Sequence, residues 1–180
     1  RAAMSLGIVT EDPRQRWELM RDRFVDAYEK RFEPKLVKTA PCKENILLGK
    51  DADLTKLPIP TWTPGKDAGP YITSGGTVSK DPETGERNIG NYRLQVKGKD
   101  TLGFFACEGQ DAFYHRQKAW RMNRPLEVAV IIGLSSPVLF AQLHKVPYDE
   151  FNVAGGLLGE PLEVVKCETV DLEVPATSEI

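Results

Sequence analysis

The hydrophobic pattern of residues 71–107 constrains the fold most, because apolar and polar side chains alternate there with a period of two. Two turn sequences, Asp81-Pro82-Glu83-Thr84-Gly85 and Gly98-Lys99-Asp100, separate the alternating runs. In the first turn, proline presets one backbone torsion and glycine accepts the left-handed one. Successive hairpins of this kind predict an antiparallel sheet. The expected strands are the extended run 71–79 around Gly75-Gly76, residues 91–96 and residues 102–107.

Helical patterns flank this region. Residues 11–32 carry apolar side chains at spacings of three and four (Trp17, Met20, Phe24, Ala27 and Tyr28), begin at Asp12-Pro13 and stop before Pro34. Further elements are expected as helices at 110–122 and 136–144, a buried strand at 126–133, and one long strand or two with a bend at 162–174. Prolines break up residues 36–70, where Ile46-Leu47-Leu48 is the only candidate strand. The fold class is therefore α+β, an antiparallel sheet or partly open barrel with a few helices.

Charge and cysteine content exclude several classes of protein. The net charge of −2 argues against broad electrostatic binding of nucleic acid or an anionic membrane. No run of about 20 apolar residues is present, so no membrane span is expected. Cys42, Cys107 and Cys167 are far apart and odd in number, which favours reduced thiols in a cytoplasmic protein. A start at Arg1 and an end at Ile180 favour a piece of a longer chain.

The segment Asn88-Ile89-Gly90-Asn91-Tyr92-Arg93 offers an amide, a glycine that permits close approach to the backbone, and a guanidinium. These groups could hold a phosphate and a metal while directing a cation at an anionic substrate. From these six residues alone, a hairpin strand with an exposed arginine is the simpler explanation. The acids Asp111, Asp149 and Glu150 suit magnesium or manganese, or are surface acids. Of the two histidines, His115 is expected on a solvated helix face and His144 at a helix C-terminus.

Several stretches occur together, in order, over residues 45–180: Asp53-Leu54-Thr55-Lys56-Leu57-Pro58-Ile59-Pro60, Asp67-Ala68-Gly69-Pro70-Tyr71-Ile72-Thr73, Asp81 to Gly85, Asn88 to Gln95, Gly98-Lys99-Asp100, and Val165 to Ile180. In their order and spacing they resemble the UbiD family of reversible decarboxylases, which use prenylated FMN. The resemblance implies two parts: residues 1–44 as the helix and linker that end an N-terminal α/β domain, and residues 45–180 as a flavin-binding antiparallel split β-barrel that lacks its C-terminal portion.

The resemblance also assigns roles to residues. Asn88 and Glu150 match the residues that bind metal in the family. The metal would be Mn²⁺ or Mg²⁺, with K⁺ as a further ion. Asp111 stands where some members add a histidine. Glu150 comes just before a segment that reads as an Ala-Gly loop. The residues that match the cofactor-binding positions are Asn88, Asn91, Tyr92, Arg93, Phe105, Ala106, Cys107, Gln110, Asp111 and Glu150. Arg93 matches the catalytic arginine, whose two acidic partners lie shortly beyond residue 180 in the family.

The implied function is non-oxidative, reversible decarboxylation of an aromatic or α,β-unsaturated carboxylic acid through a prenylated-FMN adduct. A flavin prenyltransferase would supply the cofactor, and the protein would be a homo-oligomer. This piece alone would hold only part of an active site. Two alternatives stay open: a non-catalytic flavin- or phosphate-binding module, and a structural or oligomerisation domain without a site of its own.

Overall fold

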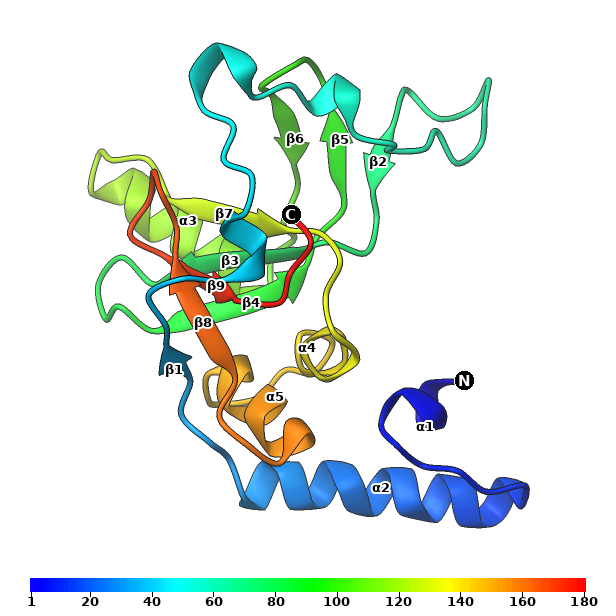
Figure 1. Cartoon of the computed structure of the whole chain (residues 1–180). Helices are drawn as coiled ribbons and strands as arrows, with labels where there is room; N and C mark the ends of the chain where they lie inside the picture. The colour runs from blue at the N-terminus through cyan, green and yellow to red at the C-terminus, as the bar shows by residue number, and fades with distance from the viewer.

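A computed structural model that describes all 180 residues has the expected α+β architecture, with three small sheets and five α-helices (Figure 1). The helices are α1 (Ala2–Ser5), α2 (Pro13–Glu29), α3 (Asp111–Arg121), α4 (Ser136–Ala141) and α5 (Glu150–Leu158). The strands are β1 (Lys35–Leu36), β2 (Tyr71–Ile72), β3 (Gly76–Lys80), β4 (Arg87–Asn91), β5 (Leu94–Val96), β6 (Leu102–Phe104), β7 (Val128–Ile131), β8 (Glu163–Lys166) and β9 (Glu173–Pro175). Short 3₁₀ turns cover Pro41–Lys43, Gly49–Asp51 and Leu54–Lys56.

The hairpin around Asp81–Gly85 builds the central sheet, of strand order β4-β3-β7. The Asp81 carboxylate accepts the backbone N–H of Glu83 at 2.9 Å, and Gly85 takes a φ of 78°, as the turn sequence predicts. All pairs in this sheet are antiparallel, with Val78 opposite Ile89 on one side and Ala129 on the other. Helices α4 and α5, together with Leu162 and Val164 at the start of β8, supply the rest of the core on this sheet. The buried cluster comprises Val78, Ile89, Ile131, Val138, Ala141, Phe151, Val153, Ala154, Leu162 and Val164.

Two further sheets flank the central one (Figure 1). The antiparallel sheet β2-β5-β6 rises from one end of it, and α3 follows β6. In the third sheet β8 pairs with β1 in parallel and with β9 in antiparallel fashion. Hydrogen bonds do not join the three sheets into a closed barrel. The split barrel and the division at residue 44 stay predictions.

The helix predicted from residues 11–32 is α2, which begins where its sequence signals place it. The Asp12 carboxylate accepts the N–H of Arg14 at 2.9 Å and Pro13 is the first helical residue, an N-terminal cap of the expected kind. Only the C-terminal half of the apolar stripe is covered, because Ala27 is fully buried while Trp17 is exposed. Helix α2 lies along α5, where a Cβ on Gly156 would come within 2.5 Å of the Ala27 carbonyl oxygen.

Several strand predictions are wrong in extent. Residues 91–96 are not one strand, because the chain leaves the central sheet at Asn91 and enters the second sheet at Leu94. The run 71–79 likewise divides between two sheets, and Ile46-Leu47-Leu48 is not a strand. For the runs 71–79 and 91–96, the alternation of side chains continues through a corner and so cannot reveal it. The run 162–174 is two strands, β8 and β9.

Helix α5 is missing from the sequence prediction, and the Ala-Gly loop expected there is wrong. Gly155 and Gly156 lower the helix propensity of this segment by about 1 kcal/mol each. Packing outweighs that loss, because both glycines let neighbouring backbone approach closely: Phe32 at Gly155 and Ala27 at Gly156. Tertiary contact, rather than local preference, makes this segment helical.

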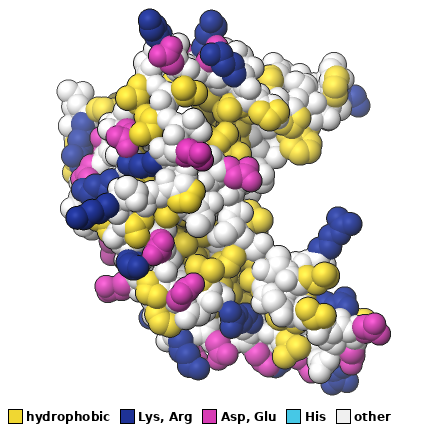
Figure 2. All heavy atoms as spheres, viewed as in Figure 1, with side chains coloured by type: hydrophobic (Ala, Val, Ile, Leu, Met, Phe, Trp, Pro, Cys, Tyr) yellow, Lys and Arg dark blue, Asp and Glu magenta, His cyan; other side chains and the backbone are white.

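The molecule is shaped like a letter C, hollowed between the β2-β5-β6 sheet and the α1–α2 arm (Figure 2). None of its helices is both long enough and apolar enough to cross a membrane.

Candidate functional site

A cavity of about 230 Å³ lies where β4, the start of α3 and the segment between α4 and α5 meet. Six of the residues predicted to bind cofactor or metal line it: Asn88, Asn91, Tyr92, Gln110, Asp111 and Glu150. A neighbouring cavity of about 800 Å³ shares Asn88, Asp111 and Glu150 with the first. The three predicted metal ligands come from three separate elements, and the fold brings them to one place.

Glu150 is the buried acid of the site and the first residue of α5. Its Oε2 accepts the backbone N–H of Ile89 at 3.2 Å, which ties α5 to β4. Burial raises the pKa of the Glu150 carboxyl from 4.5 to about 7, and the nearby carboxylates of Asp149 and Asp111 act in the same direction. A buried acid of this kind is readily ionised by a bound cation.

Asn88 and Tyr92 form a buried pair beside it. The Asn88 Nδ2 donates to the Tyr92 hydroxyl at 3.5 Å, which leaves the amide oxygen of Asn88 free of protein hydrogen bonds. The same hydroxyl accepts the backbone N–H of Ala112 at 3.3 Å and so satisfies a donor in the first turn of α3. Burial raises the pKa of the Tyr92 hydroxyl. A Cβ on Gly90 would lie 2.6 Å from the Tyr92 ring, so the group that needs this glycine is the tyrosine itself.

Asp111 begins α3 and faces a lysine. The Lys145 Nζ lies 3.6 Å from an Asp111 carboxylate oxygen and donates to the Gly109 carbonyl at 2.9 Å. Gln110 precedes Asp111, and its side-chain oxygen accepts the N–H of Cys107 at 2.7 Å. Lys145 also lines both cavities, although no sequence pattern singles it out.

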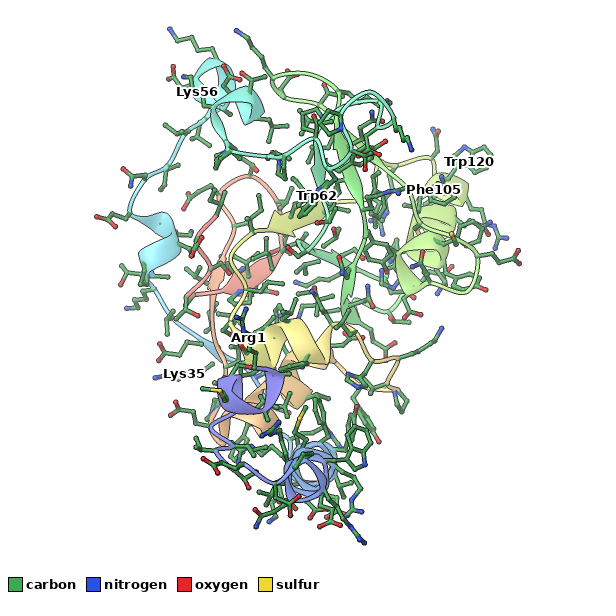
Figure 3. All side chains as sticks on the ribbon, turned by 90° about the vertical axis from the view of Figure 1, so that its right-hand side faces the viewer. Arg1, Lys35, Lys56, Trp62, Phe105 and Trp120 are labelled. Atoms are coloured by element: carbon green, nitrogen blue, oxygen red, sulfur yellow. The ribbon has the colours of Figure 1, made fainter.

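Four predicted residues lie outside this cavity: Arg93, Phe105, Ala106 and Cys107. Phe105 is 72% exposed (Figure 3), Cys107 is exposed, and Ala106 is buried against Tyr92 and Ala112. Arg93 is exposed, with its guanidinium 5.2 Å from the centre of the Tyr71 ring. With its amide nitrogen turned inward, Asn91 donates to the Thr73 and Gly75 carbonyls, which fixes the corner that follows β4. These residues lie around the corner where the chain passes from β4 to the β2-β5-β6 sheet.

One of the two histidines, His115, lies in surroundings that differ from those expected. His115 is buried, and its Nδ1 lies 2.9 Å from the Ser79 hydroxyl, so the solvated face predicted for it is wrong. Because several nearby residues of α3 are charged, the sequence pattern does not reveal that the His115 ring packs inward. Burial lowers the pKa of His115. His144 follows α4, and its Nδ1 lies 2.8 Å from the Phe140 carbonyl, in keeping with the helix end expected for it.

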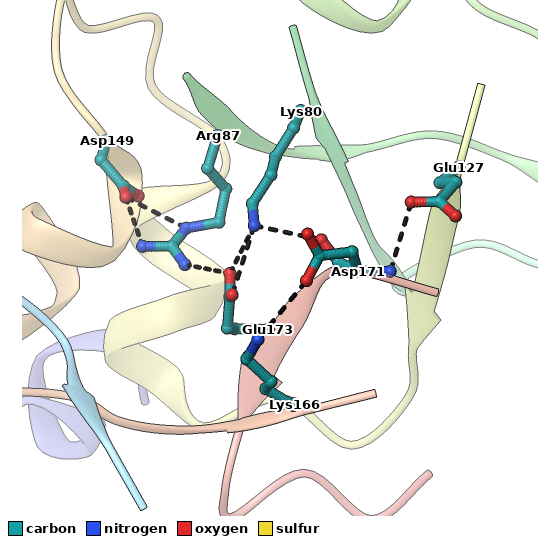
Figure 4. A network of polar contacts seen from close by, with 7 residues as sticks. All are labelled: Lys80, Arg87, Glu127, Asp149, Lys166, Asp171 and Glu173. Carbon is teal, nitrogen blue, oxygen red and sulfur yellow. Dashed lines mark hydrogen bonds and ion pairs between the residues drawn. The ribbon is translucent and has the colours of Figure 1, made fainter. Parts of the chain in front are cut away.

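Arg87 anchors the start of α5 to the sheets (Figure 4). Its guanidinium pairs with the Asp149 carboxylate, which caps α5, and with Glu173 on β9 at 3.1 Å. It also lies 4.5 Å from the centre of the Phe151 ring. The sequence singled out Asp149 as an acid but gave no partner for it. The network holds the helix turn that carries Glu150.

The donors around the cavity fit a hard cation. Asn88, Asp111 and Glu150 contribute oxygen atoms, which magnesium and manganese prefer. No group of three or more histidine, cysteine, aspartate or glutamate side chains gathers in a metal-binding arrangement, so amide oxygens would have to complete such a site.

Comparison with known proteins gives a family match. Residues 35–180 match the family model described as UbiD, 3-octaprenyl-4-hydroxybenzoate carboxy-lyase Rift-related domain. An uncharacterised protein of Aquifex aeolicus is 44% identical over 149 residues, which cover 82% of this chain and 30% of that protein.

Solved structures agree in fold. An evolved dimeric form of the UbiD-class enzyme HmfF from Pelotomaculum thermopropionicum, in complex with prFMN, has a TM-score of 0.86 at 40% identity, over 98% of this chain and 40% of its own. Vanillic acid decarboxylase from Sedimentibacter hydroxybenzoicus has a TM-score of 0.87 at 32% identity, over 98% of this chain and 38% of its own. The chain thus spans less than half the length of these proteins.

Proposed function

The chain belongs to the UbiD family, and we propose that it is the cofactor-binding part of a non-oxidative, reversible decarboxylase. The substrate would be an aromatic or α,β-unsaturated carboxylic acid. The observation that carries the proposal is the cavity at which Asn88, Asp111 and Glu150 converge. The likeness to HmfF, whose structure contains prFMN, supports the same cofactor here. We also propose that residues 45–180 form the split barrel, and that residues 1–44 belong to a preceding domain.

In this proposal Asn88 and Glu150 would hold Mn²⁺ or Mg²⁺ against the flavin phosphate, with Asp111 beside them. The high pKa of Glu150 fits this role, because a cation favours the ionised carboxylate that burial disfavours. Lys145 would limit the negative charge at Asp111. The cation that these protein oxygens hold would neutralise charge on the phosphate.

Arg93 would hold the substrate carboxylate by paired, charge-assisted hydrogen bonds. Its exposed position next to the Tyr71 ring leaves the guanidinium accessible to a ligand. When bound, prenylated FMN supplies an electron sink for the electron pair left behind as CO₂ departs. The acids that would work with Arg93 are expected beyond residue 180.

The same proposal covers the supply of the cofactor, the further ion, the cellular location and the assembly of the protein. A flavin prenyltransferase would provide the cofactor, K⁺ would accompany the divalent ion, and the protein would act as a cytoplasmic homo-oligomer. The dimeric form of HmfF is a precedent for assembly in a relative.

Decarboxylation of a panel of aromatic and α,β-unsaturated acids tests the proposal, with the longer protein that contains this chain produced alongside a flavin prenyltransferase. We expect CO₂ release and exchange of labelled CO₂ into the acid, both abolished by Arg93→Ala. Asn88→Ala should release the flavin, visible as a lost absorbance band. A cofactor-loaded protein that neither releases nor exchanges CO₂ with any acid would contradict the enzymatic function.

A second candidate is a flavin- or phosphate-binding module without catalysis. Its support is Asp111, which stands where some family members have a histidine and lies 3.6 Å from the Lys145 ammonium. Flavin binding that depends on Asn88 but not on Arg93, in a protein inactive on every acid, would favour this function.

A further inference from the structure

Lys145 reaches from one wall of the 230 Å³ cavity to another. Its backbone lies in the segment between α4 and α5, and its side chain extends to the start of α3. There the Nζ donates to the Gly109 carbonyl at 2.9 Å and lies 3.6 Å from an Asp111 carboxylate oxygen. Both of these residues also line the cavity. The ammonium therefore lies at the edge of the space in which the flavin phosphate is proposed to bind.

These two contacts leave the ammonium free to bind a further group. An ammonium carries three N–H donors, and the bond to Gly109 uses one of them. The distance to Asp111 is that of an ion pair but is too long for a good hydrogen bond. The Lys145 side chain is 69% exposed, and ion pairs at such exposed positions contribute little. An anion with more charge than a carboxylate would therefore compete well with Asp111 for this group.

The charges around the cavity give Lys145 a role once a phosphate is present. It is the only lysine or arginine in the lining, which also holds the carboxylates of Asp111 and Glu150. A phosphate monoester adds roughly 1.5 to 2 negative charges near pH 7, so a divalent cation alone would leave the filled site negative. A lysine ammonium forms strong, charge-assisted hydrogen bonds with phosphate oxygens. Lys145 is thus the group in the lining that suits this anion directly.

We propose that Lys145 donates to the phosphate of the bound flavin, as a contact separate from the cation held by Asn88 and Glu150. This inference rests on the proposed function, since it completes the binding of the same cofactor. It assigns a cofactor-binding role to a residue that the family resemblance left without one.

Calorimetric titration with FMN and with riboflavin tests the inference, because FMN carries the phosphate and riboflavin lacks it. The sample is the longer protein that contains this chain, produced without the prenylated cofactor and supplied with Mn²⁺. Lys145→Met removes the charge and keeps a flexible side chain. We expect the Kd for FMN to rise at least about tenfold and the Kd for riboflavin to stay within about twofold. Lys145→Arg keeps the charge and should bind FMN more tightly than Lys145→Met.

Lys166→Met is the matched control. The Lys166 side chain is 61% exposed and its Nζ lies 3.5 Å from an Asp171 carboxylate oxygen, so its exposure and ion pair are close to those of Lys145. Lys166 lines neither cavity, and its loss should leave the affinity for FMN unchanged.

An Asp111→Asn background separates a phosphate contact from simple neutralisation of Asp111. Equal FMN affinities of Asp111→Asn with and without Lys145→Met would overturn the inference, because the lysine would then act only on that carboxylate. Equal losses for FMN and riboflavin in Lys145→Met would make the residue structural and overturn it too. Unchanged FMN affinity in Lys145→Met, with binding that still requires Asn88, would overturn this inference alone. A wild-type protein that binds FMN no better than riboflavin would overturn both this inference and the proposed phosphate site.

Discussion

At the scale of single residues, Glu150 shows two opposing effects on one carboxyl group. As the first residue of α5 it lies at the positive end of a helix, which favours the ionised form by about 0.3–1 kcal/mol. Burial acts the other way and is larger, because a pKa of about 7 in place of 4.5 corresponds to about 3 kcal/mol. The residue therefore costs stability whenever it is ionised without a cation.

The sign of this effect makes a prediction about pH. Because the folded pKa lies above the unfolded one, the contribution of Glu150 is fully present below pH 4.5 and is lost as the pH rises through 7. Between pH 5 and pH 8, the free energy of unfolding of the wild type should fall by about 2–3 kcal/mol because of Glu150, and this fall should be absent from Glu150→Gln. Urea unfolding of both metal-free proteins measures the difference, and parallel pH profiles would contradict the prediction. Added Mn²⁺ should flatten the wild-type profile only.

Gly90 gives a second test at this scale. Gly90→Ala places a methyl group against the Tyr92 ring, and overpacking of this kind costs about 1–3 kcal/mol. Gly98→Ala is the control, because its nearest neighbour, the Thr101 Cβ, would be 3.9 Å away. Chemical unfolding should show a clear loss of stability for the first variant and a change within about 0.5 kcal/mol for the second. Equal stabilities would mean that the tyrosine ring moves aside freely.

At the scale of elements, Arg87 joins β4, α5 and β9 (Figure 4). Its side chain is only 12% exposed, so Arg87→Ala would leave Asp149 and Glu173 without their shared partner. We expect a loss of about 3 kcal/mol. Lys35→Ala breaks the exposed pair with Glu163 and should cost less than about 1 kcal/mol. Thermal or urea unfolding compares the two, and similar losses would show that burial of the Arg87 network adds nothing.

The elements also show what could be predicted from the sequence. The hairpin at Asp81–Gly85 and the start of α2 at Asp12-Pro13 follow from local chemistry, so both predictions are confirmed. The corner between Asn91 and Leu94 does not follow from local chemistry. It depends on Tyr92, which folds back against Gly90 and α3. Helix α5 escaped prediction for the same reason, since contact with α2 outweighs its glycines.

The candidate site follows the same division. Asn88 and Glu150 were selected through resemblance, and the fold brings them to one cavity. Lys145 carries no local signal, because a lysine near a helix end is common on protein surfaces. Only the arrangement in space distinguishes it, because it lies against Asp111 in the lining of the same cavity.

At the scale of the whole molecule, α5 connects the site to the N-terminal arm. Its first residue is Glu150, in the cavity, and its middle packs on α2 through Gly156. The Arg23 guanidinium adds a bond to the Leu157 carbonyl at 2.7 Å. Helices in proteins owe most of their stability to the packing of one face, so α2 depends on this contact.

Gly156→Val tests that dependence, because the new side chain would meet the Ala27 backbone, 2.5 Å from where its Cβ must lie. We expect α2 to separate from α5, with backbone amides of residues 17–29 exchanging hydrogen at least about tenfold faster, since the lost contact is worth more than about 1.4 kcal/mol. Leu158→Ala is the control in the same helix, at a partly exposed position, and should leave exchange in α2 unchanged. Protection of α2 at the wild-type level in Gly156→Val would show that the arm is held by other contacts. The Arg87–Asp149 pair should hold the first turn of α5 in place even when α2 separates. In Gly156→Val, the amides of Ile89 and of this first turn should therefore keep their wild-type protection from hydrogen exchange. That result would show that the cavity does not depend on the α2 contact.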